Sequence, residues 1–379
     1  MNLTEFNAIM LLSDGFGGFG GISQFNKDFL TAVDRSGLVT RTLVFPRLIR
    51  QRLDQELPET IVYFRHSAAG KSNYFRQLMR GLRLSSDVHL VICGHLHLLP
   101  LAVLAAKIKR ARVALIIHGI EAWQPTQYRL ANNLVSQIDS LVSVSRFSAE
   151  KFSSWSGIET KRAFILGNCV DLGRFVPMPR DTALAARYGL GGHSVIMTLG
   201  RLANRERYKG FDEVLEVLPA LVKDLPTLRY LIVGDGDDRQ RLEAKVKGLG
   251  IQKYVVFAGK PSEEEKIAHY SLADAYVMPS SGEGFGIVLL EAAACGVPII
   301  GSAVDGSKEA LLGGAIGQLV DPRDLGALRD AIRTSLESKS AHSRSPSVEF
   351  FGVPAFQDKV RYWLETEIDA SVRTAAMAA

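Results

Sequence analysis

Two glutamates, Glu283 and Glu291, enclose a seven-residue segment that combines a glycine loop with the start of a helix. Apolar residues precede the loop at 275–278, and helix-forming residues follow it at 287–295. Gly296 and the proline two positions later form a helix stop signal. The segment therefore predicts a strand, a glycine loop and a short helix, with one carboxylate in the loop and the other on the helix.

This arrangement favours a ligand that carries both phosphate and hydroxyl groups. A helix N-terminus exposes unpaired backbone N–H groups and the positive end of the helix dipole, which together bind phosphate. Carboxylates repel phosphate but accept hydrogen bonds from hydroxyls, so Glu283 and Glu291 predict polyhydroxyl groups beside it. A nucleotide sugar has this composition. The alternative is a buried strand–helix unit whose glutamates only cap and solvate it, but the three loop glycines and the second glutamate favour a binding site.

A second glycine-rich loop lies near the N-terminus, between a strand predicted at 8–12 and a helix predicted at 22–33. Gly15, Gly17 and Gly20 satisfy the G-x-G-x-x-G pattern of dinucleotide sites. No acidic residue ends the next strand, where the ribose of a nicotinamide dinucleotide needs one, so that ligand is disfavoured. We expect these glycines to let the backbone approach a phosphate or a sugar, and a tight turn without a ligand is the alternative.

His118 directly follows a strand predicted at 113–117. Open α/β sheets bind ligands at the carboxyl ends of their strands, so this position suits a ligand contact. A lone histidine is also common as a packing residue, and the pattern leaves both interpretations open.

Strands and helices alternate along the whole chain, which predicts an α/β protein. Glycine, proline, arginine and aspartate interrupt the pattern at 168–181, after which it starts again. We therefore expect two doubly wound, Rossmann-like domains at 1–175 and 185–350, and a C-terminal helix within 351–379 that returns to the N-terminal domain. Further strands are predicted at 41–45, 61–64, 88–93, 140–144, 194–199, 230–233, 255–258 and 297–301.

Length and composition are those of a soluble globular protein with more than one domain. The chain has 379 residues, of which 47% are hydrophobic and 22% charged. Its three cysteines show no paired spacing, which disfavours a disulfide framework or a zinc site and favours the cytosol. No signal peptide is expected, because residues 1–7 include no basic residue and the apolar run after them is brief. No membrane-spanning segment is expected either, because the longest apolar stretch, 90–106, contains two histidines and a proline.

Charge is distributed unevenly along the chain. Residues 1–180 hold 22 Lys and Arg against 13 Asp and Glu, and the remaining residues hold 23 against 27. Nine of the basic residues lie within 41–83. A basic face indicates an anionic partner, such as a phosphorylated acceptor, an anionic membrane surface or a nucleic acid. An ordinary solvated basic surface is the alternative.

Taken together, these motifs resemble the retaining glycosyltransferases of family 4, whose GT-B architecture has two Rossmann-like domains facing across a cleft. The resemblance covers most of the chain and is strongest from 194 to 322. It rests above all on the two glutamates and the Ala-Cys-Gly-Val-Pro run after them. The resemblance implies that Glu283 contacts the hydroxyls of a donor sugar and that Glu291 holds the ribose. Backbone N–H groups beside the sugar would come from Gly284, Phe285 and Gly286.

Two cations match the family's pair for the diphosphate leaving group. The resemblance assigns this role to Arg201 and Lys209, because two fixed cations neutralise developing negative charge without a metal. The gap between them is longer than usual and contains Arg205 and Arg207, which are further candidates for the phosphate contact. The aspartates at 237–238 are interpreted as a turn after a strand, so neither a metal nor another cofactor is expected.

In the N-terminal domain, Gly20 and Gly21 match the family's glycine pair on the donor side. His118 matches a histidine beside the donor sugar. Gly119 follows it where many relatives have an aspartate, so no contact is assigned to that second position.

The resemblance implies transfer of a hexose from a nucleoside diphosphate sugar to an acceptor hydroxyl, with retention at the anomeric carbon. No pair of nucleophiles is evident on the sugar face, which favours a front-side mechanism. The segments 206–210 and 305–309 resemble bacterial exopolysaccharide mannosyltransferases, so GDP-mannose is the first choice of donor and UDP-glucose the alternative. The expected acceptor is a glycan or a polyprenyl-diphosphate-linked glycan. The expected location is the cytoplasm, at an anionic inner membrane face, with no nucleic acid partner.

Three other functions are compatible with parts of the pattern. A nucleotide-sugar epimerase shares the architecture. A nicotinamide-dependent oxidoreductase would need the missing ribose-binding acid. A non-catalytic nucleotide-sugar-binding subunit is disfavoured by the intact set of charged positions.

Overall fold

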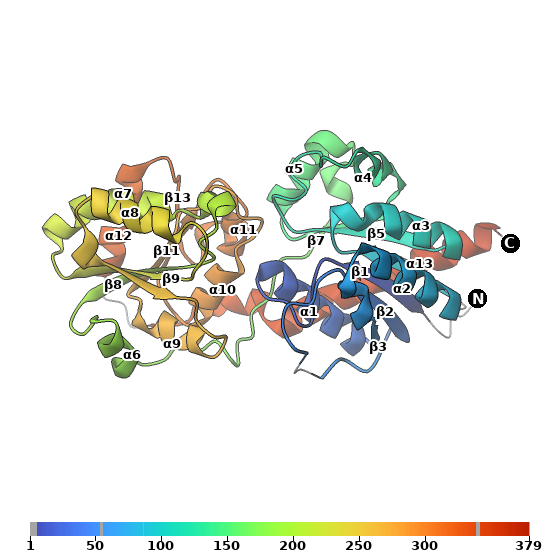
Figure 1. The fold of residues 1–379 in the computed structure, drawn as a ribbon, viewed down its shortest axis with the longest axis horizontal. Coiled ribbons are helices and arrows are strands. Elements are labelled where there is room, and N and C mark those ends of the chain that lie inside the picture. The colour runs from blue at the N-terminus through green and yellow to red at the C-terminus, as the bar shows by residue number, and fades with distance from the viewer. Residues whose placement is uncertain (1–5, 54–55, 86, 339–341, 379) are drawn as a thin grey trace. The chain divides into compact units, whose positions relative to one another are not determined.

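The computed structural model describes residues 6–53, 56–85, 87–338 and 342–378. The chain folds as two compact units, which are coloured along the sequence in Figure 1. Unit 1 comprises Met1–Cys169 and Val353–Ala379, and unit 2 comprises Val170–Gly352. None of the helices in the described part of the chain is long and apolar enough to cross a membrane.

Unit 1 is built on a parallel sheet with the strand order β3-β2-β1-β4-β5-β6-β7. Its strands are β1 (Asn7–Leu12), β2 (Arg41–Pro46), β3 (Ile61–Tyr63), β4 (Leu90–Cys93), β5 (Arg112–Ile117), β6 (Ser140–Ser143) and β7 (Ala163–Ile165). Its α-helices are α1 (Gly21–Arg35), α2 (Lys71–Leu84), α3 (Leu99–Lys109), α4 (Arg129–Asn133), α5 (Arg146–Ser156) and α13 (Val353–Ala378). Short 3-10 helices are η1 (Arg65–Ala69), η2 (Leu96–Leu98), η3 (Leu134–Gln137) and η4 (Thr160–Arg162).

Strand β1 shows why the sheet of unit 1 is buried on both faces. Ile9 and Leu11 join a core that includes Leu78 of α2 and Leu99 of α3. Because side chains alternate along a strand, Met10 points to the opposite face, where it is also fully buried. A parallel sheet covered on both faces needs such continuous apolar strands, and this is the pattern that the sequence shows.

Helix α13 brings the C-terminal part of the chain back to unit 1. Phe356 and Trp363 of α13 pack against Phe25 and Phe29 of α1, with ring centroids 5.9 and 5.6 Å apart. Trp363 is almost fully buried. The core of unit 1 is therefore completed by residues that are more than 300 positions away from α1 in the sequence.

Unit 2 contains a second parallel sheet, with the order β10-β9-β8-β11-β12-β13. Its strands are β8 (Ser194–Leu199), β9 (Leu228–Val233), β10 (Val255–Gly259), β11 (Ala275–Met278), β12 (Ile299–Ser302) and β13 (Gln318–Val320). Its α-helices are α6 (Thr182–Arg187), α7 (Phe211–Asp224), α8 (Arg239–Gly248), α9 (Glu265–Leu272), α10 (Ile287–Ala294), α11 (Ser307–Ala310) and α12 (Leu325–Glu337). Short 3-10 helices are η5 (Asn204–Lys209), η6 (Gln252–Tyr254), η7 (Leu312–Gly314) and η8 (Pro346–Phe351).

The predicted α/β fold with two doubly wound parallel sheets is confirmed. Strands β8 and β11 begin and end where the apolar runs predict. The sequence analysis missed β7 and β13, which are three residues long and lie at sheet edges. A three-residue strand carries little periodicity; β3 (Ile61–Tyr63) is equally short and also lies at a sheet edge, but it was predicted. The cleft expected between the two domains stays a prediction.

Candidate functional site

The predicted donor residues of unit 2 follow the carboxyl ends of β8 and β11. These two strands are neighbours in the sheet, and the strand order reverses between them. Arg201 follows β8, whereas Glu283 follows β11. Such a reversal leaves a crevice at the carboxyl ends of the strands, where open α/β sheets bind ligands. The fold therefore brings residues that are distant in the sequence to one edge of the sheet.

Glycines let the loops at this edge pack backbone against backbone. Gly234 has a φ of +145°, and a Cβ atom there would overlap the carbonyl oxygen of Gly200. A Cβ atom at Gly306 would overlap the carbonyl oxygen of Gly284. Only glycine allows these two approaches. The loop after β9 thereby packs directly on the loop after β8, and the loop after β12 on the loop after β11.

Lys209 and Glu283 form an enclosed ion pair in the site. The Nζ atom of Lys209 lies 2.5 Å from Oε1 of Glu283, and their side chains are 16% and 15% exposed. Burial lowers the pKa of Lys209, but Glu283, Tyr208 and Glu206 together outweigh burial, and the net pKa is raised. The amine is therefore fully protonated at neutral pH. The predicted phosphate cation and the predicted sugar carboxylate hold each other in place.

The loops that carry this pair are also joined by backbone contacts. The N–H of Ser281 donates to the carbonyl of Tyr208 at 2.8 Å, and a Cβ atom at Gly282 would collide with the Tyr208 ring. The short helix η5 therefore lies directly against the glycine loop that follows β11.

Arg201 makes a two-point ion pair with Glu206 of η5, and its side chain is 48% exposed. The sequence analysis did not single out Glu206. Arg207 pairs with Asp238 at 3.4 Å instead of pointing free, and Arg205 is exposed. Glu206, which lies in the long gap between Arg201 and Lys209, therefore forms an ion pair with the arginine that is predicted to bind phosphate.

Glu291 is buried on α10 and has two partners on α9. Its Oε2 atom accepts a hydrogen bond from the Tyr270 hydroxyl at 2.8 Å, and Oε1 lies 3.3 Å from Nζ of Lys266. Both partners were missed by the sequence analysis. The signal available was their spacing, because residues four apart share one face of a helix. Glu291 is thus fixed in orientation but lies apart from the Lys209–Glu283 pair in its contacts.

The glycine loop ends at the start of α10. Gly286 has a φ of +94°, and no side chain caps the helix. Phe285 is buried against Phe351, with ring centroids 5.7 Å apart. The buried Phe285 side chain fixes the loop, and this fixes the orientation of the backbone N–H groups at the N-terminus of α10.

The aspartates after β9 have structural partners. Asp237 accepts a hydrogen bond from the N–H of Asn204 at 2.8 Å, and Asp238 pairs with Arg241 at 2.7 Å. Among the described residues, no group of three or more His, Cys, Asp and Glu side chains is arranged to hold a metal ion. The interpretation of this segment as a turn agrees with these contacts.

In unit 1, Gly20 and Gly21 stand at the start of α1. Gly20 has a φ of +95°, and the space where its Cβ atom would lie is open. Both glycines are exposed. The first N–H groups of α1 are therefore accessible, because no side chain caps this helix either.

His118 lies at the carboxyl end of β5, which neighbours β4 in the sheet. Its ring is buried, packs edge-on against Phe25, and has Nε2 3.2 Å from the carbonyl oxygen of Gly94. A carbonyl only accepts hydrogen bonds, so Nε2 carries the proton. Burial lowers the pKa of His118, and nearby Glu121 only partly offsets it. The ring is therefore neutral at neutral pH, and its contact with a donor sugar stays a prediction.

Asp14, in the loop after β1, is a buried carboxylate that sequence reasoning missed. Burial raises its pKa, and its backbone carbonyl accepts a hydrogen bond from the side chain of Asn26. Asp14 directly precedes the glycine-rich loop at the end of a strand, which could have indicated a functional position, but the prediction used only the glycines.

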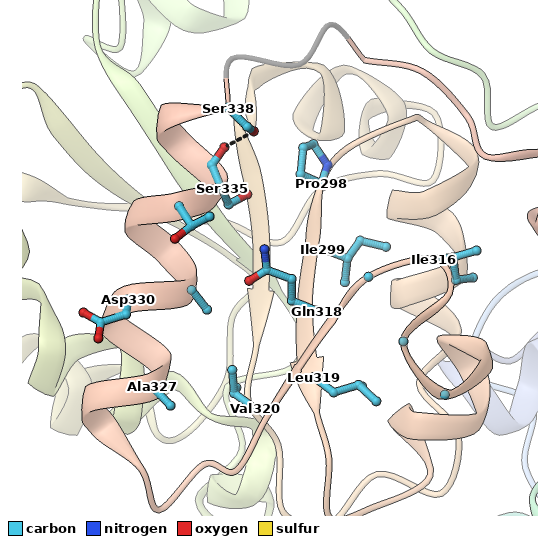
Figure 2. Close-up of a pocket in the computed structure, with 15 residues that line it drawn as sticks. Pro298, Ile299, Ile316, Gln318, Leu319, Val320, Ala327, Asp330, Ser335 and Ser338 are labelled. Carbon is cyan, nitrogen blue, oxygen red and sulfur yellow. Dashed lines mark hydrogen bonds between the residues drawn. The ribbon is translucent and has the colours of Figure 1, made fainter.

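A surface pocket elsewhere in unit 2 lies between α12 and β13, as Figure 2 shows. Gln318, Asp330 and Ser335 are among its lining residues. None of the predicted donor residues lines it. The pocket is therefore separate from the residues at the β8 and β11 ends.

Comparison with known proteins places the sequence in a defined group. The family described as "Glycosyl transferases group 1" matches residues 188–346. The chain is 34% identical over 247 residues to the GDP-mannose-dependent alpha-(1-6)-phosphatidylinositol monomannoside mannosyltransferase of Mycolicibacterium smegmatis, covering 62% of this chain and 64% of that protein. It is 32% identical over 268 residues to the protein of the same description from Mycobacterium tuberculosis, covering 67% of this chain and 68% of that protein.

A solved structure has the same fold. The Anabaena protein HepE in complex with UDP-glucose matches 95% of this chain and 99% of its own, with a TM-score of 0.75 and 19% sequence identity. Identity at this level supports the fold alone, whereas the sequence matches define the family. The chain belongs to the group 1 glycosyltransferases and has their two-domain GT-B fold.

Proposed function

We propose that this chain is a retaining glycosyltransferase that moves a hexose to the hydroxyl of a glycan or a polyprenyl-diphosphate-linked glycan. The observation that carries the proposal is the Lys209–Glu283 contact beside the ends of β8 and β11. A fixed cation suits a diphosphate, and a fixed carboxylate suits sugar hydroxyls. The mycobacterial relatives support GDP-mannose as the donor, and the HepE complex supports UDP-glucose as the alternative.

In the proposed front-side reaction, the bond between the anomeric carbon and the diphosphate oxygen breaks. The acceptor oxygen bonds to that carbon on the same face, and its proton passes to an oxygen of the leaving diphosphate. Arg201 and Lys209 stabilise the charge that develops there. Neither a protein nucleophile nor a metal ion is required, so transfer should persist in the presence of a chelator.

The donor is tested by thermal unfolding with GDP, GDP-mannose, UDP and UDP-glucose. A ligand present at 100 times its dissociation constant should stabilise the protein by about 2.7 kcal/mol. We expect the largest shift from GDP-mannose, followed by GDP. A larger shift with the uridine pair would establish the alternative donor, and no shift with any of the four would reject the function.

Product analysis separates the proposed activity from its rivals. With donor alone, an epimerase would yield an interconverted sugar nucleotide, whereas the proposed enzyme needs an acceptor. A change in reduced nicotinamide absorbance on adding protein would point to an oxidoreductase. Donor binding without transfer to any lipid-linked or free glycan would leave only a nucleotide-sugar-binding subunit.

Helix α2 supports a membrane-bound acceptor. One exposed face, here called the α2 surface, carries two rows of residues four apart: Lys71, Ser72, Phe75, Arg76, Met79, Arg80, Arg83 and Leu84. Phe75 is 47% exposed and Leu84 is 64% exposed. None of the four cations on this surface has an ion-pair partner among the described residues. Exposed apolar groups among cations favour an anionic lipid surface.

Vesicle sedimentation tests this partner. We expect binding to phosphatidylglycerol vesicles that falls with salt, and no binding to phosphatidylcholine vesicles. Replacing Arg76, Arg80 and Arg83 with Gln should abolish it. The matched control replaces Lys223, Lys247 and Lys253 of unit 2 with Gln and should bind as wild type does. Equal loss in both variants would attribute binding to net charge and reject the α2 surface.

A further inference from the structure

Asp305 is a buried carboxylate beside the candidate donor site that no predicted role uses. It lies between β12 and α11, and only 2% of it is exposed. A carboxyl group so deeply buried needs hydrogen bonds to offset its loss of hydration. Its partners therefore indicate what it holds in place.

Hydrogen-bond donors surround the carboxylate of Asp305. The Ser280 hydroxyl and the N–H of Glu283 donate to Oδ2 at 2.7 and 2.9 Å, and the N–H of Ser307 donates to Oδ1 at 2.9 Å. Burial raises the pKa of Asp305, while these hydrogen bonds act in the opposite direction. All three partners are donors, which suits a carboxylate that accepts on both oxygens.

These contacts hold both sides of the Glu283 residue. Its N–H donates to Asp305, and its carbonyl accepts a hydrogen bond from the N–H of Gly306 at 2.9 Å. Gly306 also packs so closely on Gly284 that no side chain fits between them. The backbone of Glu283 is thereby fixed while its carboxylate contacts Lys209.

We propose that Asp305 is the positioning residue for Glu283, and that it sets recognition of the donor sugar rather than of the nucleotide. This inference rests on the proposed function, in which Glu283 contacts the sugar hydroxyls. The ribose side has separate support, because Glu291 is held by Tyr270 and Lys266 and has no hydrogen bond to Asp305. Loss of Asp305 should therefore affect the two halves of the donor unequally.

The first test uses Asp305→Asn and isothermal titration with GDP and GDP-mannose, or with UDP and UDP-glucose if wild type prefers that pair. We expect the affinity for the diphosphate to change less than two-fold. The affinity for the sugar nucleotide, and kcat/KM, should fall roughly 10-fold to 100-fold, because a misplaced reactive-site group has losses of that size. Equal weakening of both ligands would overturn the inference.

A double-mutant cycle provides the second test. If Asp305 acts through Glu283, the double variant Asp305→Asn, Glu283→Gln should bind the sugar nucleotide no more weakly than Glu283→Gln alone. Additive losses would mean that Asp305 has an independent structural role, and the inference would be wrong. The control is Asp274→Asn, which removes another carboxylate that accepts a backbone N–H, from Val195 at 2.7 Å, next to the opposite end of β8. It should leave both affinities unchanged.

A milder variant keeps the inference testable if Asp305→Asn does not fold. Ser280→Ala removes one donor to Asp305 and should reproduce the selective loss of sugar-nucleotide affinity at a smaller size. Unchanged selectivity in that variant would count against the inference. Absence of binding by wild type to all four nucleotides would instead overturn the proposed function, and this inference with it.

Discussion

At the scale of single residues, both predicted phosphate cations already hold carboxylates. Lys209 contacts Glu283, and Arg201 contacts Glu206. The two pairs differ in burial, since Lys209 is mostly enclosed and Arg201 is half exposed. A diphosphate would therefore meet one cation that is fixed and another that must exchange its partner.

Replacing either cation with alanine should slow the chemical step. For Arg201→Ala or Lys209→Ala, we expect the activation free energy to rise by about 3 kcal/mol, as for other preorganised groups that stabilise developing charge. Initial rates of transfer at saturating donor measure this change. The control, Arg329→Ala, removes an exposed cation paired with Asp330 on α12 and should leave the rate unchanged. Wild-type turnover with both Arg201 and Lys209 replaced would reject their assignment.

Removing the carboxylate of Glu206, which competes with the diphosphate for Arg201, should strengthen diphosphate binding. In Glu206→Gln, Arg201 loses its anionic partner, so we expect nucleoside diphosphate to bind several-fold more tightly. Titration with the diphosphate and with the uncharged nucleoside checks this, because only the former should respond. Glu243→Gln, which removes an exposed partner of Arg239, is the matched control. Weaker binding by Glu206→Gln would mean that Glu206 orients Arg201 productively.

The sequence predicts the residues of the candidate site better than it predicts the residues that contact them. Glu283, Glu291, Arg201 and Lys209 follow from spacing along one stretch or from a family pattern. Glu206 lies only five residues from its partner Arg201, whereas Asp305 acts through contacts that depend on which strands are neighbours. Sheet order is set by packing of the whole unit, so no local pattern reveals those contacts.

At the scale of elements, the glycines at the strand ends determine how closely the loops approach. A position needs glycine where the backbone of a neighbouring loop packs against it, and the local turn alone does not show this. Gly234 and Gly306 both face a backbone carbonyl, whereas Gly248 faces open space at the end of α8. The sequence presents all three as similar loop or helix-end glycines.

An alanine scan of these glycines should separate the two classes. We expect Gly234→Ala to lower the free energy of unfolding by roughly 2 kcal/mol or more, because it adds both steric overlap and an unfavourable φ. Gly248→Ala should be neutral or stabilising by about 0.5–1 kcal/mol. Urea denaturation of the full chain measures both. Similar stability of the two variants would contradict the proposed loop crossing.

Long apolar elements were easier to predict than short or remote ones. Strands β8 and β11 are continuous apolar runs with turn residues on both sides, so their limits are visible in the sequence. Helix α13 starts at Val353 and extends to Ala378. The sequence predicts that this helix returns to the N-terminal domain, and the packing of Phe356 and Trp363 identifies α1, at the other end of the chain, as its partner.

At the scale of the whole molecule, stability should depend on pH through buried histidines. His95 caps η2 by accepting the N–H of His97 on Nδ1, which requires that nitrogen to be unprotonated. Burial lowers the pKa of His95 to about 4, against the opposing effect of Glu121. The unfolded chain, with an ordinary value of 6.5, therefore binds a proton first as pH falls.

This difference predicts a loss of stability in acid. Between pH 6.5 and about 4, the unfolded state holds more protons than the folded state, so the free energy of unfolding should fall by roughly 1–3 kcal/mol. Urea denaturation at pH 7.5 and pH 5 measures it. His95→Asn keeps an oxygen that can cap η2 and should flatten the pH dependence. The same slope in both proteins would assign the effect to other groups, including His118.

The division of unit 1 into two segments has a consequence for biosynthesis. Unit 2 is a single continuous stretch, Val170–Gly352, whereas unit 1 needs both its early strands and α13. A ribosome delivers Trp363 only after all of unit 2 has emerged, and until then Phe25 and Phe29 lack their covering helix. Domains fold as units when their residues are available. Unit 2 can therefore complete its folding before unit 1. Unit 1 is synthesised first in large part, but it cannot complete its folding until α13 has been synthesised.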